Sequence, residues 1–254
     1  MFSMNRLASA AALAAALTAS HAAVAEPVKN VVLVHGYFAD GSGWQGVADI
    51  LTRDGFKVSV VQQPETSFED DVKATHNAID AADGPSIVVG HSYGGMVITQ
   101  AGDDPKVAGL VYVAAFEPEV GETLRDLAEK MPPATNGIKL TKDGHLYFDS
   151  ISFAADFAAG VKPAAARFMA ISQVLPAVQT ANAPVTRAAW KSKPSWAVVS
   201  SEDRTVNPDL ERFMAQRAGS TITEIHGGHV AFIAHPAQVA KVIEQAARKS
   251  GETP

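Results

Sequence analysis

The sequence predicts a doubly wound α/β fold, in which helices cover both faces of a mostly parallel β-sheet and a helical cap is inserted late in the chain. Short β-branched runs alternate with stretches whose apolar residues have helical spacing. Most of these runs are apolar on both alternate faces, as in parallel strands that lie between two layers of helices. One long segment without such runs interrupts the alternation and indicates the cap.

Six runs are predicted to be strands of this sheet. They are Val31–Val34, Lys57–Val61, Ser86–Val89, Ala108–Ala114, Ser195–Ser200 and Thr221–Ile225. Apolar residues at helical spacing occur from Trp44 to Leu51, from Phe68 to Ile79 and from Val239 to Ala246. Alternating strands and helices of this kind are typical of a parallel sheet that is built from βαβ units.

The alternation stops from about Pro118 to Pro194, where Ala-rich helical pieces are punctuated by proline and glycine. A segment of this length without core strands, placed between two core strands, is typical of an inserted domain element. We therefore expect a helical cap at about 118–194 within a domain of residues 26–254. Apolar residues of the cap that could line a pocket are Phe148, Phe153, Phe157, Phe168, Met169, Ile171, Val174 and Leu175.

Residues 1–25 have the pattern of a secretory signal peptide. One basic residue, Arg6, precedes an apolar run that extends from Leu7 to about Ala19, and Ala23-Val24-Ala25 provides a cleavage motif. The run is too short to span a bilayer. An Ala-rich first helix is the alternative. We expect cleavage after Ala25, export to the periplasm or the extracellular space, and no membrane anchor after the signal is removed.

The composition excludes several classes of function. The 254 residues are 47% hydrophobic and 19% charged, and the formal net charge is −6 without a basic run, which argues against nucleic acid as a partner. The chain contains no cysteine, so disulfides, thiol nucleophiles and thiolate metal sites are excluded. Any nucleophile must therefore be an oxygen or a nitrogen. The histidines show no metal-ligand spacing, so we predict no metal site.

The clearest chemical motif is Gly90-His91-Ser92-Tyr93-Gly94, which lies between a predicted strand and the apolar run Met96-Val97-Ile98. A Gly-x-Ser-x-Gly sequence between a strand and a helix predicts a nucleophile elbow. Gly90 and Gly94 would remove the side chains that collide where the strand reverses into the helix. The alternative is a glycine-serine turn without chemistry. We predict that Ser92 is the nucleophile.

A serine needs a base to accept its proton, and this type of fold places the triad in the order Ser, acid, His. Asp203 follows the predicted strand Ser195–Ser200, and His229 follows two glycines after the strand Thr221–Ile225. We predict that His229 is the base and that Asp203 orients its imidazole. The rival acids are Glu202, Glu117 and Glu119, and the rival bases are His226 and His235. For His91 we expect packing or hydrogen bonding at the turn.

The loop that follows the first strand is expected to complete an oxyanion hole. It reads His35-Gly36-Tyr37-Phe38, and Gly36 would let the loop bend so that the Tyr37 N–H meets the Tyr93 N–H. Phe38 could take the place of Tyr37. We expect His35 to hydrogen-bond loop backbone.

Taken together, His35-Gly36, Gly90–Gly95, Ser201–Arg204 and Gly228-His229 resemble the α/β-hydrolase superfamily over residues 28–248. Val34-His35-Gly36, followed by Gly43-Trp44, is similar to the branch of small esterases, plant methyl esterases and hydroxynitrile lyases. The resemblance implies a Ser-His-Asp mechanism, no cofactor and a cap that selects the substrate. Hydroxynitrile lyases carry a lysine directly after the catalytic histidine, whereas this chain has Val230, which counts against cyanohydrin cleavage.

Haloalkane dehalogenases and epoxide hydrolases of this superfamily use an aspartate as nucleophile, so Ser92 favours acyl chemistry. We therefore expect a secreted serine hydrolase that cleaves a small carboxylic ester through an acyl-enzyme. The partner is then a small-molecule ester, with lactones and amides as further candidates. The alternatives are a cofactor-free perhydrolase or haloperoxidase, and a non-catalytic protein of the same fold that binds a small ligand. The sequence carries no signal for an oligomeric state.

Overall fold

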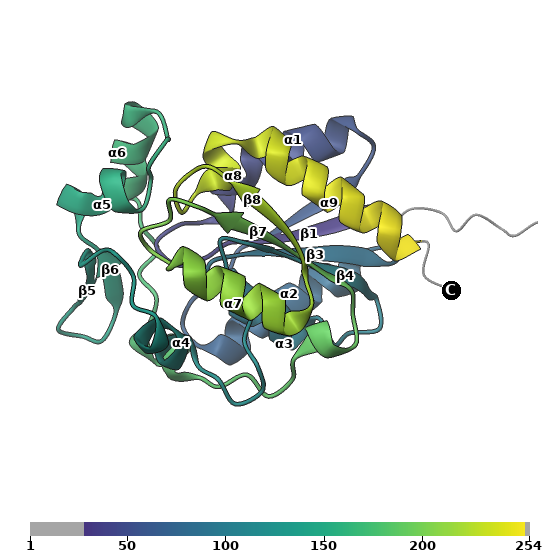
Figure 1. Cartoon of the computed structure of the whole chain (residues 1–254), viewed down its shortest axis with the longest axis horizontal. Helices are drawn as coiled ribbons and strands as arrows, with labels where there is room; N and C mark the ends of the chain where they lie inside the picture. The colour runs from purple at the N-terminus through teal and green to yellow at the C-terminus, as the bar shows by residue number, and fades with distance from the viewer. Residues whose placement is uncertain (1–27, 252–254) are drawn as a thin grey trace, which may run out of the picture.

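A computed structural model describes residues 28–251, so the predicted signal peptide lies outside the described residues. Six parallel strands form the central sheet in the order β2-β1-β3-β4-β7-β8 (Figure 1). They are β1 (Asn30–Val34), β2 (Lys57–Val61), β3 (Ser86–His91), β4 (Val107–Val113), β7 (Ser195–Ser200) and β8 (Thr221–Ile225). The predicted fold class is confirmed, and all six predicted strands are present.

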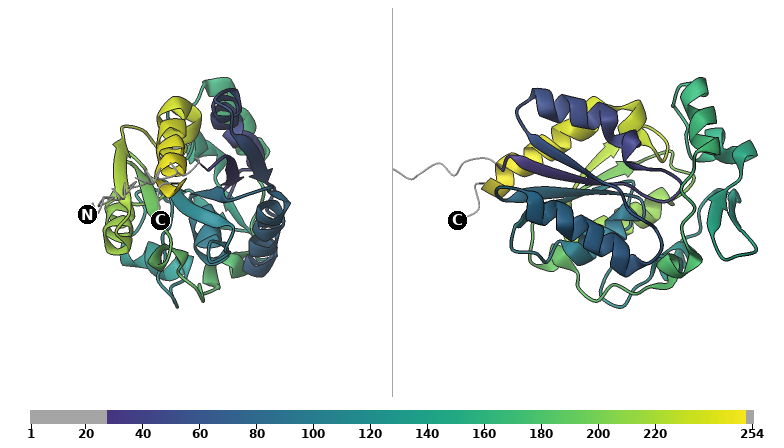
Figure 2. Two further views of the ribbon diagram at one scale, coloured as in Figure 1. Left: turned by 90° about the vertical axis from the view of Figure 1, so that its right-hand side faces the viewer. Right: turned by 180° about the vertical axis from the view of Figure 1, so that it is seen from behind.

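Helices cover both faces of this sheet (Figures 1 and 2). One layer contains α1 (Gln45–Arg53), the short α8 (Ala231–Ala234) and α9 (Pro236–Gly251), while the other contains α2 (Phe68–Ala81), α3 (Gly94–Ala101) and α7 (Pro208–Ala218). The strands β1, β3 and β7 are buried along their whole length, whereas the edge strands β2 and β8 are each buried only at their last residue. None of the helices formed by residues 28–251 is long and apolar enough to cross a membrane.

The pairing of the strands brings distant segments to one edge of the sheet. Val34 of β1 pairs with Gly90 of β3, and Ser200 of β7 pairs with Ile225 of β8. The loops that follow these four residues therefore begin at the carboxyl end of the sheet, where open α/β folds place their sites. Ser92 lies two residues beyond Gly90, and the loops that carry Asp203 and His229 begin directly after β7 and β8.

Residues 118–194, here called the cap segment, form the connection between β4 and β7. Its elements are α4 (Leu124–Lys130), β5 (Ile138–Leu140), β6 (Leu146–Phe148), α5 (Ser150–Asp156), α6 (Pro163–Ile171) and the 3₁₀ helices η2 (Val178–Asn182) and η3 (Ala189–Lys191). The antiparallel pair β5–β6 was not predicted, because each strand has only three residues. Figure 1 shows α5, α6 and this pair together at one end of the sheet.

Candidate active site

Ser92 occupies a sharp turn between β3 and α3. Its φ of +53° lies in the left-handed region, a conformation that costs a non-glycine residue about 1–3 kcal/mol. A Cβ added to Gly90 would lie 2.5 Å from the carbonyl oxygen of Gly94, so the turn cannot close around a side chain there. The Ser92 carbonyl accepts hydrogen bonds from the N–H groups of Gly95 (3.0 Å) and Phe116 (3.2 Å). These contacts hold the strained geometry that is typical of a nucleophile elbow.

Asp203 and His229 form a buried pair. The distance between His229 Nδ1 and Asp203 Oδ2 is 2.6 Å, and both side chains are fully buried. Asp203 Oδ1 accepts hydrogen bonds from the N–H groups of Thr205 (2.7 Å) and Val206 (2.9 Å), which fix the carboxylate. A carboxylate only accepts, so Nδ1 carries the proton. The other ring nitrogen, Nε2, has no partner among the described residues and is the one that can take a proton.

His91 attaches the loop of His229 to the elbow. Its Nε2 donates to the His229 carbonyl oxygen at 3.0 Å, and the centroids of the two imidazole rings are 4.6 Å apart. Burial and the neighbouring His229 lower the pKa of His91 well below its ordinary value, so this ring is neutral. His91 therefore makes the hydrogen bond at the turn that the sequence led us to expect.

The rival acids and bases have contacts elsewhere. Glu202 and His226 face solvent with side chains 60% and 84% exposed, and they lie 3.7 Å from each other. Glu119 forms an ion pair with Lys191. His235 precedes α9 and packs beside Gly227. In residues 28–251 no group of three or more histidine or carboxylate side chains could hold a metal ion.

Glu117, the remaining rival, is buried behind β4. Its carboxylate accepts a hydrogen bond of 2.6 Å from the Ser220 hydroxyl, and Arg217 binds its carbonyl oxygen. Burial raises the pKa of Glu117 to about 8, against the opposing effects of Ser220 and Arg217. The folded chain therefore holds a proton on Glu117 between about pH 4.5 and 8, where an unfolded glutamate has lost it.

Replacing Glu117 by glutamine is expected to change how stability depends on pH. Between about pH 4.5 and 8 the carboxyl of Glu117 ionises in the unfolded chain but stays protonated in the folded one. The free energy of unfolding of the wild-type protein therefore falls as the pH rises through this window. The Glu117→Gln variant does not titrate, so its stability relative to wild type should increase by more than about 1 kcal/mol across this window. Denaturant unfolding at several pH values measures the difference. Glu119→Gln is the surface control, and parallel curves for wild type and Glu117→Gln would contradict the prediction.

The loop after β1 lies directly on the elbow. A Cβ added to Gly36 would come within 2.6 Å of Ser92 Cβ and 2.8 Å of the His91 carbonyl oxygen, so only glycine permits this approach. Phe38, two residues later, has a φ of +64°. Within residues 28–251, the N–H groups of Tyr37 and Tyr93 donate to no backbone oxygen. The same holds for the N–H of Phe38, the alternative to Tyr37, so three N–H groups in these two loops have no backbone acceptor among the described residues.

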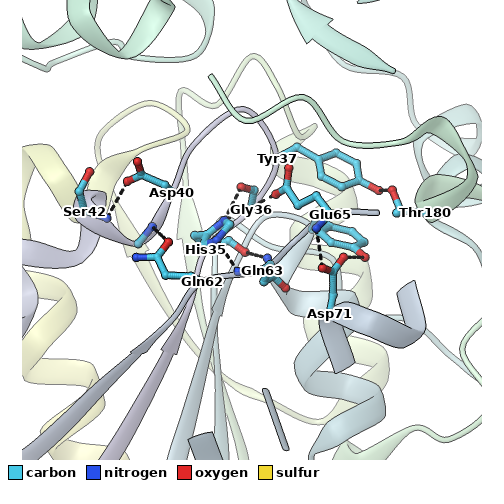
Figure 3. A network of polar contacts seen from close by, with 12 residues as sticks. His35, Gly36, Tyr37, Asp40, Ser42, Gln62, Gln63, Glu65, Asp71 and Thr180 are labelled. Carbon is cyan, nitrogen blue, oxygen red and sulfur yellow. Dashed lines mark hydrogen bonds and ion pairs between the residues drawn. The ribbon is translucent and has the colours of Figure 1, made fainter. Parts of the chain in front are cut away.

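His35 begins this loop, and two buried acids, Glu65 and Asp71, lie beside it (Figure 3). His35 Nε2 accepts from the Gln63 N–H at 3.0 Å, so its Nδ1 carries the proton and donates to the Gly36 carbonyl at 3.1 Å. This agrees with the backbone contact expected of His35. Burial and the charge of Asp71 raise the pKa of Glu65 to about 10, and burial raises the pKa of Asp71 to about 6.

The sequence analysis did not identify three buried carboxyl groups near the site. Glu65 and Asp71 lie beside the loop after β1, and Glu211 of α7 accepts a 3.2 Å hydrogen bond from the N–H of Ser200 near Asp203. Burial and the charge of Asp203 raise the pKa of Glu211 well above its ordinary value, so this carboxyl is protonated. Asp71 lies on the buried face of α2 together with Thr75 and Ile79. An acidic residue at a position where helical spacing predicts burial is the sequence signal that could have identified Asp71.

Phenylalanines of the cap segment separate the site from solvent. The Phe157 ring lies edge-on to the His229 ring, with centroids 5.1 Å apart, and Phe148 and Phe157 contact Phe38 with centroids 5.8 and 6.0 Å away. Phe153 packs against Phe157 at 4.7 Å. His229 is fully buried and Ser92 is 7% exposed. The rings of Phe38, Phe148 and Phe157 therefore form an apolar wall beside His229.

Two cavities adjoin this aromatic wall, and Phe38 lines both. One, of about 530 Å³, lies between α6 and the start of α1 and includes Phe168 and Met169. The other, of about 380 Å³, lies between α4 and the β5–β6 pair and includes Tyr37. Of the other cap residues predicted to line a pocket, Phe148, Ile171 and Leu175 line a third cavity, of about 400 Å³, between β6 and the end of α6. Ile171 and Leu175 are exposed there.

Comparisons with known proteins point to one family. The sequence pattern of the alpha/beta hydrolase family matches residues 31–242. A carbendazim hydrolyzing esterase of Nocardioides sp. (strain SG-4G) is 39% identical over 119 residues, which cover 41% of this chain and 49% of the relative. The chain thus spans about half the length of that relative. An alpha/beta hydrolase of Aspergillus novofumigatus (strain IBT 16806) is 24% identical over 244 residues, or 87% of this chain and 98% of the relative.

Solved structures share the fold at lower sequence identity. A pyrethroid hydrolase from Sphingobium faniae JZ-2 has a TM-score of 0.74 and 19% identity, covering 89% of this chain and 100% of its own. Polyneuridine aldehyde esterase has a TM-score of 0.74 and 17% identity, covering 86% of this chain and 98% of its own. A methylesterase from Arabidopsis has a TM-score of 0.74 and 15% identity, with the same coverage of both chains. At these identities the likeness concerns the fold.

Proposed function

The chain belongs to the alpha/beta hydrolase family, as the sequence resemblance predicted, and on this premise we propose that it is a serine hydrolase of small carboxylic esters. The observation that carries the proposal is the buried Asp203–His229 pair beside the strained turn of Ser92. His229 Nε2 has no hydrogen-bond partner within residues 28–251, and His91 attaches the loop of His229 to that turn. The names of the relatives, which include esterases, support the same reaction class.

In the proposed mechanism, His229 Nε2 takes the hydroxyl proton of Ser92 while Oγ attacks the ester carbonyl carbon. The carbonyl oxygen becomes an oxyanion, which the N–H groups of Tyr37 and Tyr93 stabilise. The bond to the alcohol oxygen then breaks, and His229 returns the proton to the leaving group. A water molecule next gives a proton to His229 and attacks the acyl-enzyme, which releases the carboxylic acid and restores the Ser92 hydroxyl. Asp203 holds the imidazole tautomer and stabilises the imidazolium throughout.

Two further features of the proposal concern the substrate and its place in the cell. Phe38, Phe148 and Phe157 form an apolar wall beside His229, which suits an ester with an apolar acyl or aryl group. We also propose export of a mature chain that begins at Glu26, which rests on the signal pattern in residues 1–25.

Hydrolysis of p-nitrophenyl esters from acetate to decanoate by the mature chain tests the proposal. We expect turnover with a preferred acyl length, and stoichiometric labelling by a fluorophosphonate that shifts the mass of the peptide containing Ser92. An ester of the preferred length should protect Ser92 from the label. A chain that hydrolyses no ester of the series and leaves Ser92 unlabelled would instead favour a non-catalytic protein that binds a small ligand.

A further inference from the structure

The two residues assigned to the oxyanion hole touch through their side chains. The rings of Tyr37 and Tyr93 stack with centroids 4.1 Å apart and an interplanar angle of 22°. Both residues are buried, and they come from loops after different strands. The backbone N–H groups of these residues are therefore positioned together, because a shift of one ring displaces the other.

The hydroxyl of Tyr93 is attached to Asp71. It donates to Asp71 Oδ2 at 2.7 Å, while Asp71 Oδ1 accepts from the N–H of Glu65 at 2.8 Å. Burial raises the pKa of the Tyr93 phenol well above its ordinary value, so the hydroxyl keeps its proton and donates. Asp71 thus joins Tyr93 to Glu65, which lies in the segment between β2 and α2. Asp71 and Glu65 are labelled in Figure 3.

The hydroxyl of Tyr37 leads to the cap segment. It lies 2.5 Å from Thr180 Oγ1, and Thr180 in turn donates to the Ala177 carbonyl at 2.7 Å. A threonine hydroxyl has one proton, so Tyr37 must be the donor to Thr180. The N–H of Ala177 donates to the Glu65 carbonyl at 2.9 Å. The contacts therefore return to Glu65 and form a closed circuit.

We propose that this circuit, which runs through Tyr93, Asp71, Glu65, Ala177, Thr180 and Tyr37, is a clamp that positions both N–H groups of the oxyanion hole. Asp71 and Thr180 act as positioning residues, since neither touches the reacting atoms. Ala177 and Thr180 belong to the cap segment, so the oxyanion hole takes its geometry only when the cap segment is packed in place. The inference rests on the proposed function.

The clamp acts on the transition state more than on the bound substrate. An N–H group stabilises the oxyanion when it lies about 2.7–3.1 Å from the position the oxygen will take, and removal of one donor costs about 10²–10³ in kcat. Loss of a hydroxyl that only positions the donor leaves the N–H in place but allows it to move. We therefore expect Tyr93→Phe to lower kcat by about tenfold, with KM changed less than about twofold.

The test compares single hydroxyl deletions. Tyr93→Phe and Tyr37→Phe each open the circuit, whereas the control Tyr112→Phe removes a buried hydroxyl that bonds Thr99 at 2.9 Å outside it. The control should keep kcat within about twofold while losing a similar amount of thermal stability. Because the circuit is closed, the double variant Tyr37→Phe/Tyr93→Phe should lose less than the product of the two single losses. If the loss of kcat in the double variant equals the product of the two single losses, the two hydroxyls act independently and the proposal of one clamp is wrong.

The inhibition constant of an alkyl boronic acid distinguishes positioning of the oxyanion hole from a purely structural role of the Tyr93 hydroxyl. The boronate forms a tetrahedral adduct with the nucleophile, so its Ki should rise about tenfold in Tyr93→Phe, in proportion to the loss of kcat/KM. An unchanged Ki and kcat in Tyr93→Phe, with Ser92→Ala inactive, would overturn the clamp and leave the proposed function intact. A wild-type chain without esterase activity would overturn the function and the clamp together.

Discussion

Replacing Ser92 by alanine is expected to lower kcat for the preferred p-nitrophenyl ester by about 10³-fold or more, and His229→Ala should have an effect of the same size. In the proposed mechanism Ser92 supplies the attacking oxygen, and the base is His229 Nε2, which lies on the adjoining loop and has no hydrogen-bond partner among the described residues. Groups that act as a unit are not additive, so the double variant Ser92→Ala/His229→Ala should be no slower than either single variant.

His226→Ala is the matched control for the histidine. This side chain is 84% exposed and three residues away from His229, so its removal should leave kcat within about twofold of wild type. Steady-state kinetics on purified variants, with circular dichroism to confirm folding, measure both effects. Full activity of Ser92→Ala, or a large loss in His226→Ala, would show that the assignment of the triad is wrong.

Asp203→Asn is expected to lower kcat by about 10³- to 10⁴-fold. Both carboxylate oxygens of Asp203 only accept: Oδ1 from the N–H groups of Thr205 and Val206, and Oδ2 from His229. An asparagine must turn its NH₂ group toward one of these partners. If it faces His229, the ring changes tautomer, Nε2 gains the proton, and it can no longer accept one from Ser92.

Facing the other way, the NH₂ group would meet two N–H donors, at a cost of about 1–3 kcal/mol for the unpaired buried groups. In this orientation the imidazolium also loses the negative charge that stabilises it, so the variant should lose activity in either orientation, and KM should change little. Glu202→Gln, at the neighbouring and largely exposed carboxylate, is the control and should retain activity. Equal losses in both variants would contradict the assignment of Asp203.

The sequence predicted the sheet well because its strands have strong local signals. Lys57–Val61, Ser195–Ser200 and Thr221–Ile225 appear with the predicted bounds, and β3 extends two residues further than predicted, into the elbow. The β5–β6 pair was missed because strands of three residues are too short to show alternation. Its turn signal, Asp143-Gly144, was present in the sequence but had no recognisable strands on either side.

The positions of Asp203 and His229 could also be predicted, because both follow strands that end at the same edge of the sheet. The clamp could not be predicted in this way. Thr180 meets Tyr37 across 143 positions of the chain, and Asp71 meets Tyr93 from a helix on the covering layer. No motif encodes such contacts, since they depend on how the cap segment folds back on the sheet.

The order of the strands has a consequence for the durability of catalysis. Ser92 follows β3, which is enclosed by β1 and β4, whereas His229 follows β8, which is paired on one side only by β7. Local opening begins where a backbone has the fewest partners. The proposed proton acceptor therefore follows the outermost strand, and conditions that open this edge of the sheet should abolish the proposed activity while Ser92 and the interior of the sheet are still folded.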